Sequence, residues 1–205
     1  PSITIQKIIK PILPILEAIS PAKHHSTEAH KTGLTSIETD DVSLINQYAK
    51  TKYIFITSPD VLLKKQTELP IIIFPGDYTQ ITNEADALLF LSLLSGRNPE
   101  FLIEQQVKSV EKLKNTSLEI IPTAYLLIDG GKETSVQRVS QTLPMAQENI
   151  QAIVNTALAG EYSGKQLIYL EAGSGASTKV STAVISAVKK EVSIPIIVGG
   201  GIRSE

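Results

Sequence analysis

Residues 166–176 read QLIYLEAGSGA, and residues 194–204 read IPIIVGGGIRS. Each stretch is an apolar run that ends in glycines, and the two runs are separated by roughly one helical segment. A continuous apolar run of this length is typical of a strand buried on both faces of a parallel sheet. Glycines at the end of such a strand let a phosphate approach bare backbone N–H groups. Two such turns on successive strands therefore predict a phosphate site at the C-terminal mouth of a (β/α) barrel.

The composition indicates one soluble domain with a substantial core. The chain has 205 residues, of which 42% are hydrophobic, and a formal net charge of −2. A near-neutral charge gives no electrostatic support to a nucleic-acid partner. The absence of cysteine excludes disulfides and thiolate metal sites. No apolar run approaches the roughly 20 residues that span a bilayer.

Strand and helix patterns alternate regularly from residue 66 onward. We expect strands at residues 69–74, 86–92, 118–128, 166–171 and 194–199, and one earlier strand at 52–57. Helices are expected at residues 99–114, 146–163 and 178–191, with Gly164 closing the second of them. Strands separated by helices predict βαβ units and a parallel sheet. The two glycine-rich strand ends favour a TIM (β/α)8-type barrel over an open α/β sheet.

The chain stops directly after the second glycine turn, at the point where a helix should begin. We therefore expect a single barrel domain over residues 1–205 whose last strand and helix would follow Glu205. The strand and helix spacing within residues 1–65 is short and irregular, which leaves room for missing loops there as well.

Tyr169 and Glu171 alternate along one predicted strand, so both side chains point to the same face of the sheet. If that face is the barrel interior, the pair reaches the mouth together. An ionised carboxylate in a barrel interior is costly unless it is bound to something, which favours a bound polar ligand for Glu171. For Tyr169 the alternative is an ordinary core side chain with an internally satisfied hydroxyl.

Five blocks of sequence, in this order, resemble the geranylgeranylglyceryl phosphate synthase family, which includes bacterial heptaprenylglyceryl phosphate synthases. The blocks are FPG at residues 74–76, ADALLFLSLLSGRNPE at 85–100, EIIPTAY at 119–125, YLEAGSGA at 169–176 and GGGIR at 199–203. The resemblance covers residues 66–205. The SGRNPE segment is similar to the second group of the family, whose members typically use a C20 donor.

The resemblance implies a TIM-barrel prenyltransferase of membrane ether-lipid synthesis. Such an enzyme joins the sn-3 hydroxyl of sn-glycerol 1-phosphate to geranylgeranyl diphosphate and releases pyrophosphate, with Mg²⁺ as cofactor. It also implies a cytoplasmic protein that works near the membrane and forms a homo-oligomer, either a dimer or a hexamer.

The same resemblance implies roles for individual residues. Tyr169 and Glu171 would bind the glycerol hydroxyls, and Glu171 would take the proton from the attacking hydroxyl. The acceptor phosphate would lie at the two turns, on Gly173, Ser174, Gly199, Gly200, Gly201 and Ser204. The alternative for each turn by itself is that its glycines merely end a strand.

The metal site departs from the family pattern. The family places an aspartate in an Asp-Pro-Asp/Glu-Lys context at the end of the first strand, and that string is absent here. The nearest counterpart is Asp40, which we predict as the Mg²⁺ ligand. The alternative is that Asp40 caps a helix beginning at Val42.

The donor site is expected to involve Asn98 and Tyr125. An apolar groove for the prenyl tail has candidate lining residues Phe90, Leu91, Leu93, Leu94, Tyr125 and Leu127. Each of these is equally compatible with an ordinary core position. For Asn98 the alternative is a solvated helix start.

Two other functions remain open from the sequence. A sugar-phosphate isomerase or lyase would share the phosphate site by fold analogy alone, and Asp129 is the only obvious acid or base for it. A non-catalytic homologue that binds a polyol phosphate would explain the missing Asp-Pro string.

Overall fold

The computed structural model describes residues 70–201 and, before them, the backbone of two short strands. The seven described strands form one sheet in which each neighbouring pair is parallel. Their bounds are β1 Ser36–Glu38, β2 Tyr53–Ile56, β3 Ile71–Ile73, β4 Ala87–Leu93, β5 Glu119–Leu127, β6 Leu167–Glu171 and β7 Ile196–Gly199.

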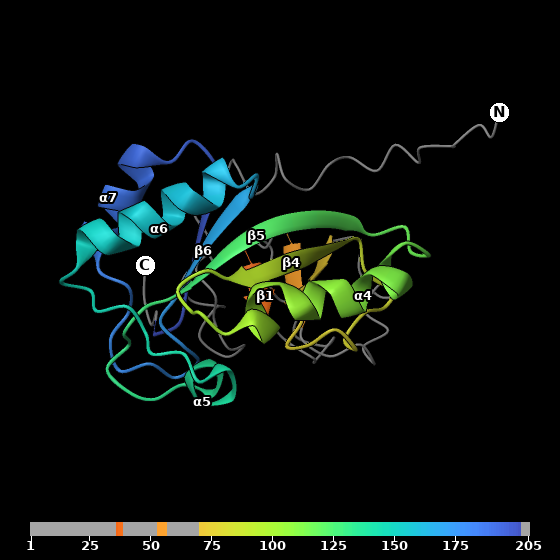
Figure 1. The fold of residues 1–205 in the computed structure, drawn as a ribbon, viewed down its shortest axis with the longest axis horizontal. Helices are drawn as coiled ribbons and strands as arrows, with labels where there is room; N and C mark the ends of the chain where they lie inside the picture. Colours follow the sequence, from red (N-terminus) through yellow and green to blue (C-terminus); the bar gives the residue numbers. More distant parts are fainter. Residues whose placement is uncertain (1–35, 39–52, 57–69, 202–205) are drawn as a thin grey trace.

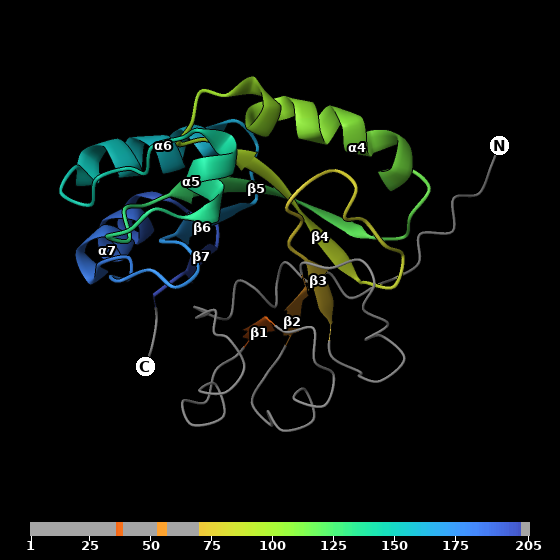
Figure 2. The same cartoon turned by 90° about the horizontal axis from the view of Figure 1, so that it is seen from below.

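The strands follow one another in the sheet in the same order as in the chain, from β1 to β7. A doubly wound open sheet would reverse this order at a switch point, whereas a barrel does not. The sheet is curled, and the helices α4, α6 and α7 lie along its outer side (Figure 1 and Figure 2). The fold is therefore of the TIM-barrel type, as the sequence predicted.

Five helical segments are described after β4. They are η2 Glu100–Glu104, α4 Gln105–Leu113, α5 Ser135–Ser140, α6 Ile150–Tyr162 and α7 Thr182–Glu191. Each of the last three helices is preceded by an N-cap residue, whose side chain accepts a hydrogen bond from the backbone N–H of the third helical residue. These caps are Thr134, Asn149 and Ser181.

The sheet separates two apolar clusters. On its outer face, residues such as Leu126, Ile168 and Leu170 pack with α6 and α7. On its inner face, alternate residues of the same strands form a second cluster that contains Tyr125, Tyr169 and Ile197. Because strand side chains alternate between faces, β5, β6 and β7 each contribute to both clusters, which explains their continuous apolar runs in the sequence.

Among the strand connections described from β3 onward, only the connection between β3 and β4 contains no helix. Residues 74–86 form only turns and bends. Every later pair of strands is joined through at least one helix. The β3–β4 connection therefore lacks the helix that a regular β/α unit would contain.

Most of the predicted elements are confirmed, including the strand expected at residues 118–128, which forms β5 in spite of Pro122. The predicted helix at residues 99–114 begins with a π-helical turn, η2, before continuing as α4. Helix α5 was not predicted from the sequence. None of the helices in the described residues is long and apolar enough to cross a membrane.

Candidate active site

Tyr169 and Glu171 lie on the inner face of β6, as their alternation predicted. Tyr169 is fully buried and Glu171 is 5% exposed. One carboxylate oxygen of Glu171, Oε1, accepts a hydrogen bond of 2.8 Å from the Gly173 N–H. This bond offsets part of the cost of burying the carboxylate, and it holds the carboxylate at the start of the first glycine turn.

Gly199 is required beside this pair for steric reasons. A Cβ atom on Gly199 would lie 2.5 Å from Glu171 Oε2 and 2.6 Å from Tyr169 Oη. Real Cβ atoms do not approach other heavy atoms so closely, and only glycine leaves both polar groups room. The glycine at the end of β7 thus makes space for the polar side chains of β6.

The two glycine turns are in contact with each other. A Cβ on Gly200 would lie 2.5 Å from the backbone N and O of Gly173, and one on Gly201 would lie 3.0 Å from Thr178 O. Both Gly200 and Gly201 have positive φ angles, which glycine adopts without strain. The structure therefore brings together the turns that the sequence placed on successive strands.

Three backbone N–H groups of these turns are available to a ligand. The N–H groups of Gly175, Gly200 and Gly201 make no hydrogen bond within the described residues. The Gly173 N–H is instead directed to Glu171. Ser174 is exposed on the first turn. The donor roles predicted for the glycines and for Ser174 stay predictions.

Gln147, which was not predicted from the sequence, holds two loops of the site together through hydrogen bonds. Gln147 Nε2 donates to Asp129 O at 2.7 Å and to Lys179 O at 3.2 Å, and Gln147 Oε1 accepts from Ser181 N at 2.7 Å. It therefore ties the loop after β5 to the loop after β6. No sequence pattern marks an isolated glutamine as such a clamp.

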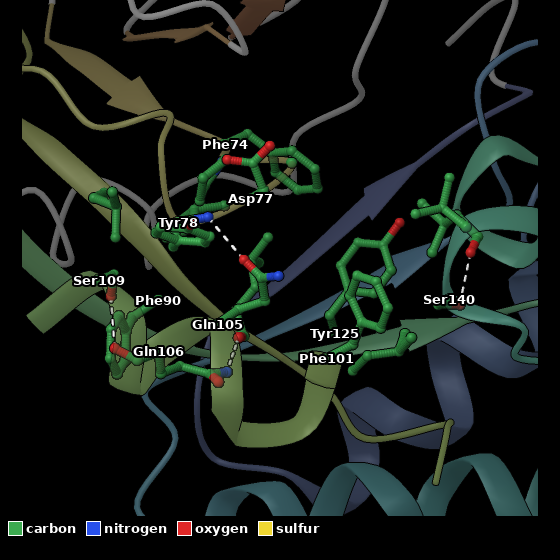
Figure 3. A pocket seen from close by; sticks show the side chains of 18 of the residues that line it. Phe74, Asp77, Tyr78, Phe90, Phe101, Gln105, Gln106, Ser109, Tyr125 and Ser140 are labelled. Atoms are coloured by element: carbon green, nitrogen blue, oxygen red, sulfur yellow. Dashed lines mark hydrogen bonds between the residues drawn. The ribbon is translucent and has the colours of Figure 1, made fainter. Parts of the chain in front are cut away.

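An apolar cavity of about 270 Å³ lies next to the inner-face cluster. Figure 3 shows Phe74, Phe101 and Tyr125 around it, with Gln105 and Gln106 of α4 at its wall. Its walls are β4, the helix-free connection after β3, the η2–α4 helix and α5. The cavity therefore lies between β4, the helix-free connection after β3 and the helical segments that follow β4.

Three aromatic rings connect the cavity to Glu171. Tyr125, which lines the cavity, stacks on Tyr169 with ring centroids 5.6 Å apart. Phe74 packs against both rings, at 5.9 Å from Tyr125 and 5.2 Å from Tyr169. Since Tyr169 is two residues from Glu171 on the same face of β6, the three rings form a continuous packed contact from the cavity wall to the strand that carries Glu171.

The outer wall of the cavity is held by a small polar network. Gln105 Oε1 accepts from the Tyr78 N–H at 2.8 Å, and Gln105 Nε2 donates to Glu100. Lys108 donates to both carboxylate oxygens of Glu100. This bond lowers the pKa of the Glu100 carboxyl and raises the pKa of the Lys108 ammonium group. The network fixes the connection after β3 against α4.

A second set of polar contacts, centred on Ser92, holds a side chain of the cavity wall in place. Ser92 Oγ accepts from Gln106 Nε2 at 3.0 Å and from Lys165 Nζ at 2.7 Å. Lys165 is half-buried, and the loss of water around its ammonium group lowers the pKa of Lys165. Gln106 is thereby anchored with its side chain at the cavity wall.

The two predicted donor-site residues differ in position. Tyr125 lines the cavity. Asn98 does not line it, and its side chain accepts from Glu100 N at 3.1 Å and donates to Ser140 O at 3.1 Å. Asn98 thus links the start of η2 to α5. Phe90, Leu91 and Leu93 also line the cavity, as predicted for a groove.

Two predicted residues lie outside the described part of the chain, namely Asp40 and Ser204. Among the described residues, no group of three or more histidine, aspartate or glutamate side chains is arranged to hold a metal ion. The described residues therefore supply no preformed cluster for a metal ion, and the predicted ligand Asp40 lies outside them.

The fold and the site together define a class of protein: a TIM-type (β/α) barrel with contacting glycine turns at the ends of two successive late strands and a buried glutamate between them. The chain belongs to the PcrB family, whose model matches residues 22–205.

Individual relatives support this assignment. The chain is similar to proteins named geranylgeranylglyceryl phosphate synthase from Zunongwangia profunda, at 61% identity over 142 residues, and from Flavobacterium johnsoniae, at 58% over 140 residues. These matches cover 69% and 68% of this chain. The chain spans only 61% and 58% of the length of these two relatives.

Solved structures show the same likeness. A GGGPS from Thermoplasma volcanium superposes with a TM-score of 0.78 at 30% identity, covering 94% of this chain and 81% of that one. The (S)-3-O-geranylgeranylglyceryl phosphate synthase from Thermoplasma acidophilum, in complex with its substrate sn-glycerol-1-phosphate, superposes with a TM-score of 0.75 at 29% identity. That match covers 98% of this chain and 83% of the other.

The close approach at Gly199 yields a first prediction. Gly199→Ala should displace Glu171 and Tyr169, lower the free energy of unfolding by about 1–3 kcal/mol through overpacking, and weaken the binding of inorganic phosphate. Chemical denaturation and phosphate titration measure these effects. Gly164→Asn is the control, because a Cβ at Gly164 would have no atom within 4 Å. Asparagine is chosen there because it adopts the left-handed conformation of Gly164, whose φ is +85°, more readily than other side chains do. Equal stability of the two variants would contradict the steric argument.

Proposed function

We propose that the protein is a prenyltransferase that joins sn-glycerol 1-phosphate to geranylgeranyl diphosphate and releases pyrophosphate. The observation that carries this proposal is the position of Glu171 between two features. On one side lie the contacting glycine turns with available N–H groups, and on the other lies an apolar cavity reached through Tyr169 and Tyr125. The names of the similar proteins and the bound substrate of the Thermoplasma acidophilum structure agree with these two substrates.

In the proposed reaction, the sn-3 hydroxyl oxygen of the acceptor forms a bond to C1 of the prenyl chain. The bond between C1 and the diphosphate oxygen breaks, and its electron pair leaves with pyrophosphate. The hydroxyl proton passes to the Glu171 carboxylate, the nearest buried base on β6. The glycine turns hold the acceptor phosphate, and the cavity holds part of the prenyl chain away from water.

Magnesium, localisation and assembly belong to the same proposal. Mg²⁺ would accompany the diphosphate, with Asp40 as its protein ligand. We further propose a cytoplasmic homo-oligomer, either a dimer or a hexamer, that works near the membrane. The exposed apolar side chains Ile103, Val107 and Val110 on η2 and α4 are compatible with a covered surface of this kind.

The direct test is an assay with sn-glycerol 1-phosphate, geranylgeranyl diphosphate and Mg²⁺, with the ether product detected by mass spectrometry. We expect an ether product from the wild-type protein and none after chelation with EDTA. Absence of product from folded wild-type protein that still binds the acceptor would favour the non-catalytic homologue.

Glu171→Gln tests the role of the carboxylate. The amide retains an oxygen for the Gly173 N–H but cannot take a proton at neutral pH, so kcat should fall by about 10²- to 10⁴-fold. Binding of sn-glycerol 1-phosphate, measured by calorimetry, should change only a few-fold. Glu161→Gln is the control, because Glu161 binds Ser193, which precedes β7, whereas the site residues lie at and after the ends of β6 and β7. An unchanged kcat in Glu171→Gln would remove the proposed base.

Val139→Arg tests the assignment of the cavity to the prenyl donor. Val139 of α5 is 64% exposed but lines the cavity. An arginine there should place charge and bulk at the cavity and raise the KM for geranylgeranyl diphosphate about tenfold, since burying an unpaired charge is costly. Leu143→Arg is the control, because Leu143 is 78% exposed shortly after α5 and does not line the cavity. Equal donor KM values for the two variants would place the prenyl chain elsewhere.

A further inference from the structure

Lys132 lies in the loop between β5 and α5, and the sequence analysis gave it no role. Its loop is docked firmly on the turn after β6. Gly130 O accepts hydrogen bonds from Ser177 N at 2.9 Å and from Thr178 N at 3.0 Å. Gly130 is buried, and a Cβ there would collide with Ala172 O. The backbone that carries Lys132 therefore sits at a defined place beside the first glycine turn.

The ammonium group of Lys132 lies against Gly175. Lys132 Nζ is 3.1 Å, and Cε is 3.7 Å, from the position that a Cβ on Gly175 would occupy. Gly175 is exposed, has a positive φ, and keeps its N–H available within the described residues. A lysine ammonium and an unused backbone N–H thus lie side by side on the turn where an anion is expected.

The charge of Lys132 has no acidic partner in the part of the chain that the structure describes. The described ion pairs are Lys108 with Glu100 and Lys114 with Glu111. Asp129, the nearest acid before Lys132 in the same loop, uses Oδ1 to accept from the Gly131 N–H at 2.8 Å. A cation placed beside free N–H donors and without a carboxylate partner is suited to a phosphate.

We propose that Lys132 is a further substrate-binding residue, which pairs with the phosphate of the glycerol phosphate acceptor. This inference rests on the proposed function and adds a side-chain cation to a site otherwise made of backbone N–H groups and hydroxyls. The acceptor is favoured over the diphosphate donor by position. Lys132 lies against Gly175 in the glycine turn that follows β6, and it is not among the residues that line the apolar cavity.

The test compares Lys132→Met with Lys132→Arg, and Lys190→Met is the control. Lys190 is an exposed lysine in the last turn of α7. Calorimetry measures the Kd of sn-glycerol 1-phosphate at low and at high salt, and in parallel the Kd values of inorganic pyrophosphate and of glycerol. Because Lys132 is exposed and makes no ion pair with a described residue, none of these variants should change the thermal unfolding midpoint of the free protein.

We expect Lys132→Met to weaken the binding of sn-glycerol 1-phosphate about tenfold and to reduce its salt dependence, since a charge-assisted contact to the phosphate is lost. Lys132→Arg should retain most of the affinity, and Lys190→Met all of it. Binding of glycerol alone should be the same in every variant.

The outcomes separate this inference from the proposed function. If the wild-type protein does not bind sn-glycerol 1-phosphate, the proposed function itself is overturned. If the wild type binds it and Lys132→Met binds it equally well, only the role of Lys132 is overturned. If Lys132→Met weakens pyrophosphate binding but leaves the glycerol phosphate Kd unchanged, the assignment to the acceptor is wrong.

Discussion

The site depends on one buried carboxylate. Glu171 is almost completely enclosed at the inner face of β6 and is held by the Gly173 N–H. A carboxylate in that position is unfavourable without hydrogen bonds and without space, and both come from glycine. Gly173 donates the bond, and Gly199 of the next strand leaves room for both Glu171 and Tyr169. The side chain of Glu171 is thus by itself a structural reason for Gly173 and Gly199.

A second constraint comes from the missing helix between β3 and β4. A regular β/α barrel covers each strand with a helix, whereas residues 74–86 form only turns. The space left beside β4 is the cavity, closed on one side by the bonds of Gln105 and Lys112 to Tyr78 and Thr79. An apolar cavity at this place suits the hydrocarbon chain of the proposed donor.

The two features are joined by aromatic packing. Tyr125 belongs to the cavity and Tyr169 to the polar site, and their rings stack in register across β5 and β6. This contact follows directly from parallel pairing, in which Tyr125 is opposite Tyr169. This ring contact joins the wall of the apolar cavity to the polar site at Glu171.

The sequence was sufficient for the parts of the site that follow strand periodicity. Tyr169 and Glu171 were found because a period of two places them on one face, and Gly164 was found because a helix ends at a glycine with a positive φ. Helix α5 was missed because six residues, SVQRVS, carry too little apolar periodicity. Gln147 and Lys132 were missed because loop docking depends on tertiary contacts that no local pattern records.

The central claim is that the two contacting glycine turns hold a phosphate beside Glu171. A crystal structure of this protein with sn-glycerol 1-phosphate tests it most directly. The account predicts the phosphate within hydrogen-bond distance of the Gly175, Gly200 and Gly201 N–H groups, with a glycerol hydroxyl on Glu171. A phosphate bound elsewhere, with no glycerol hydroxyl on Glu171, would contradict it.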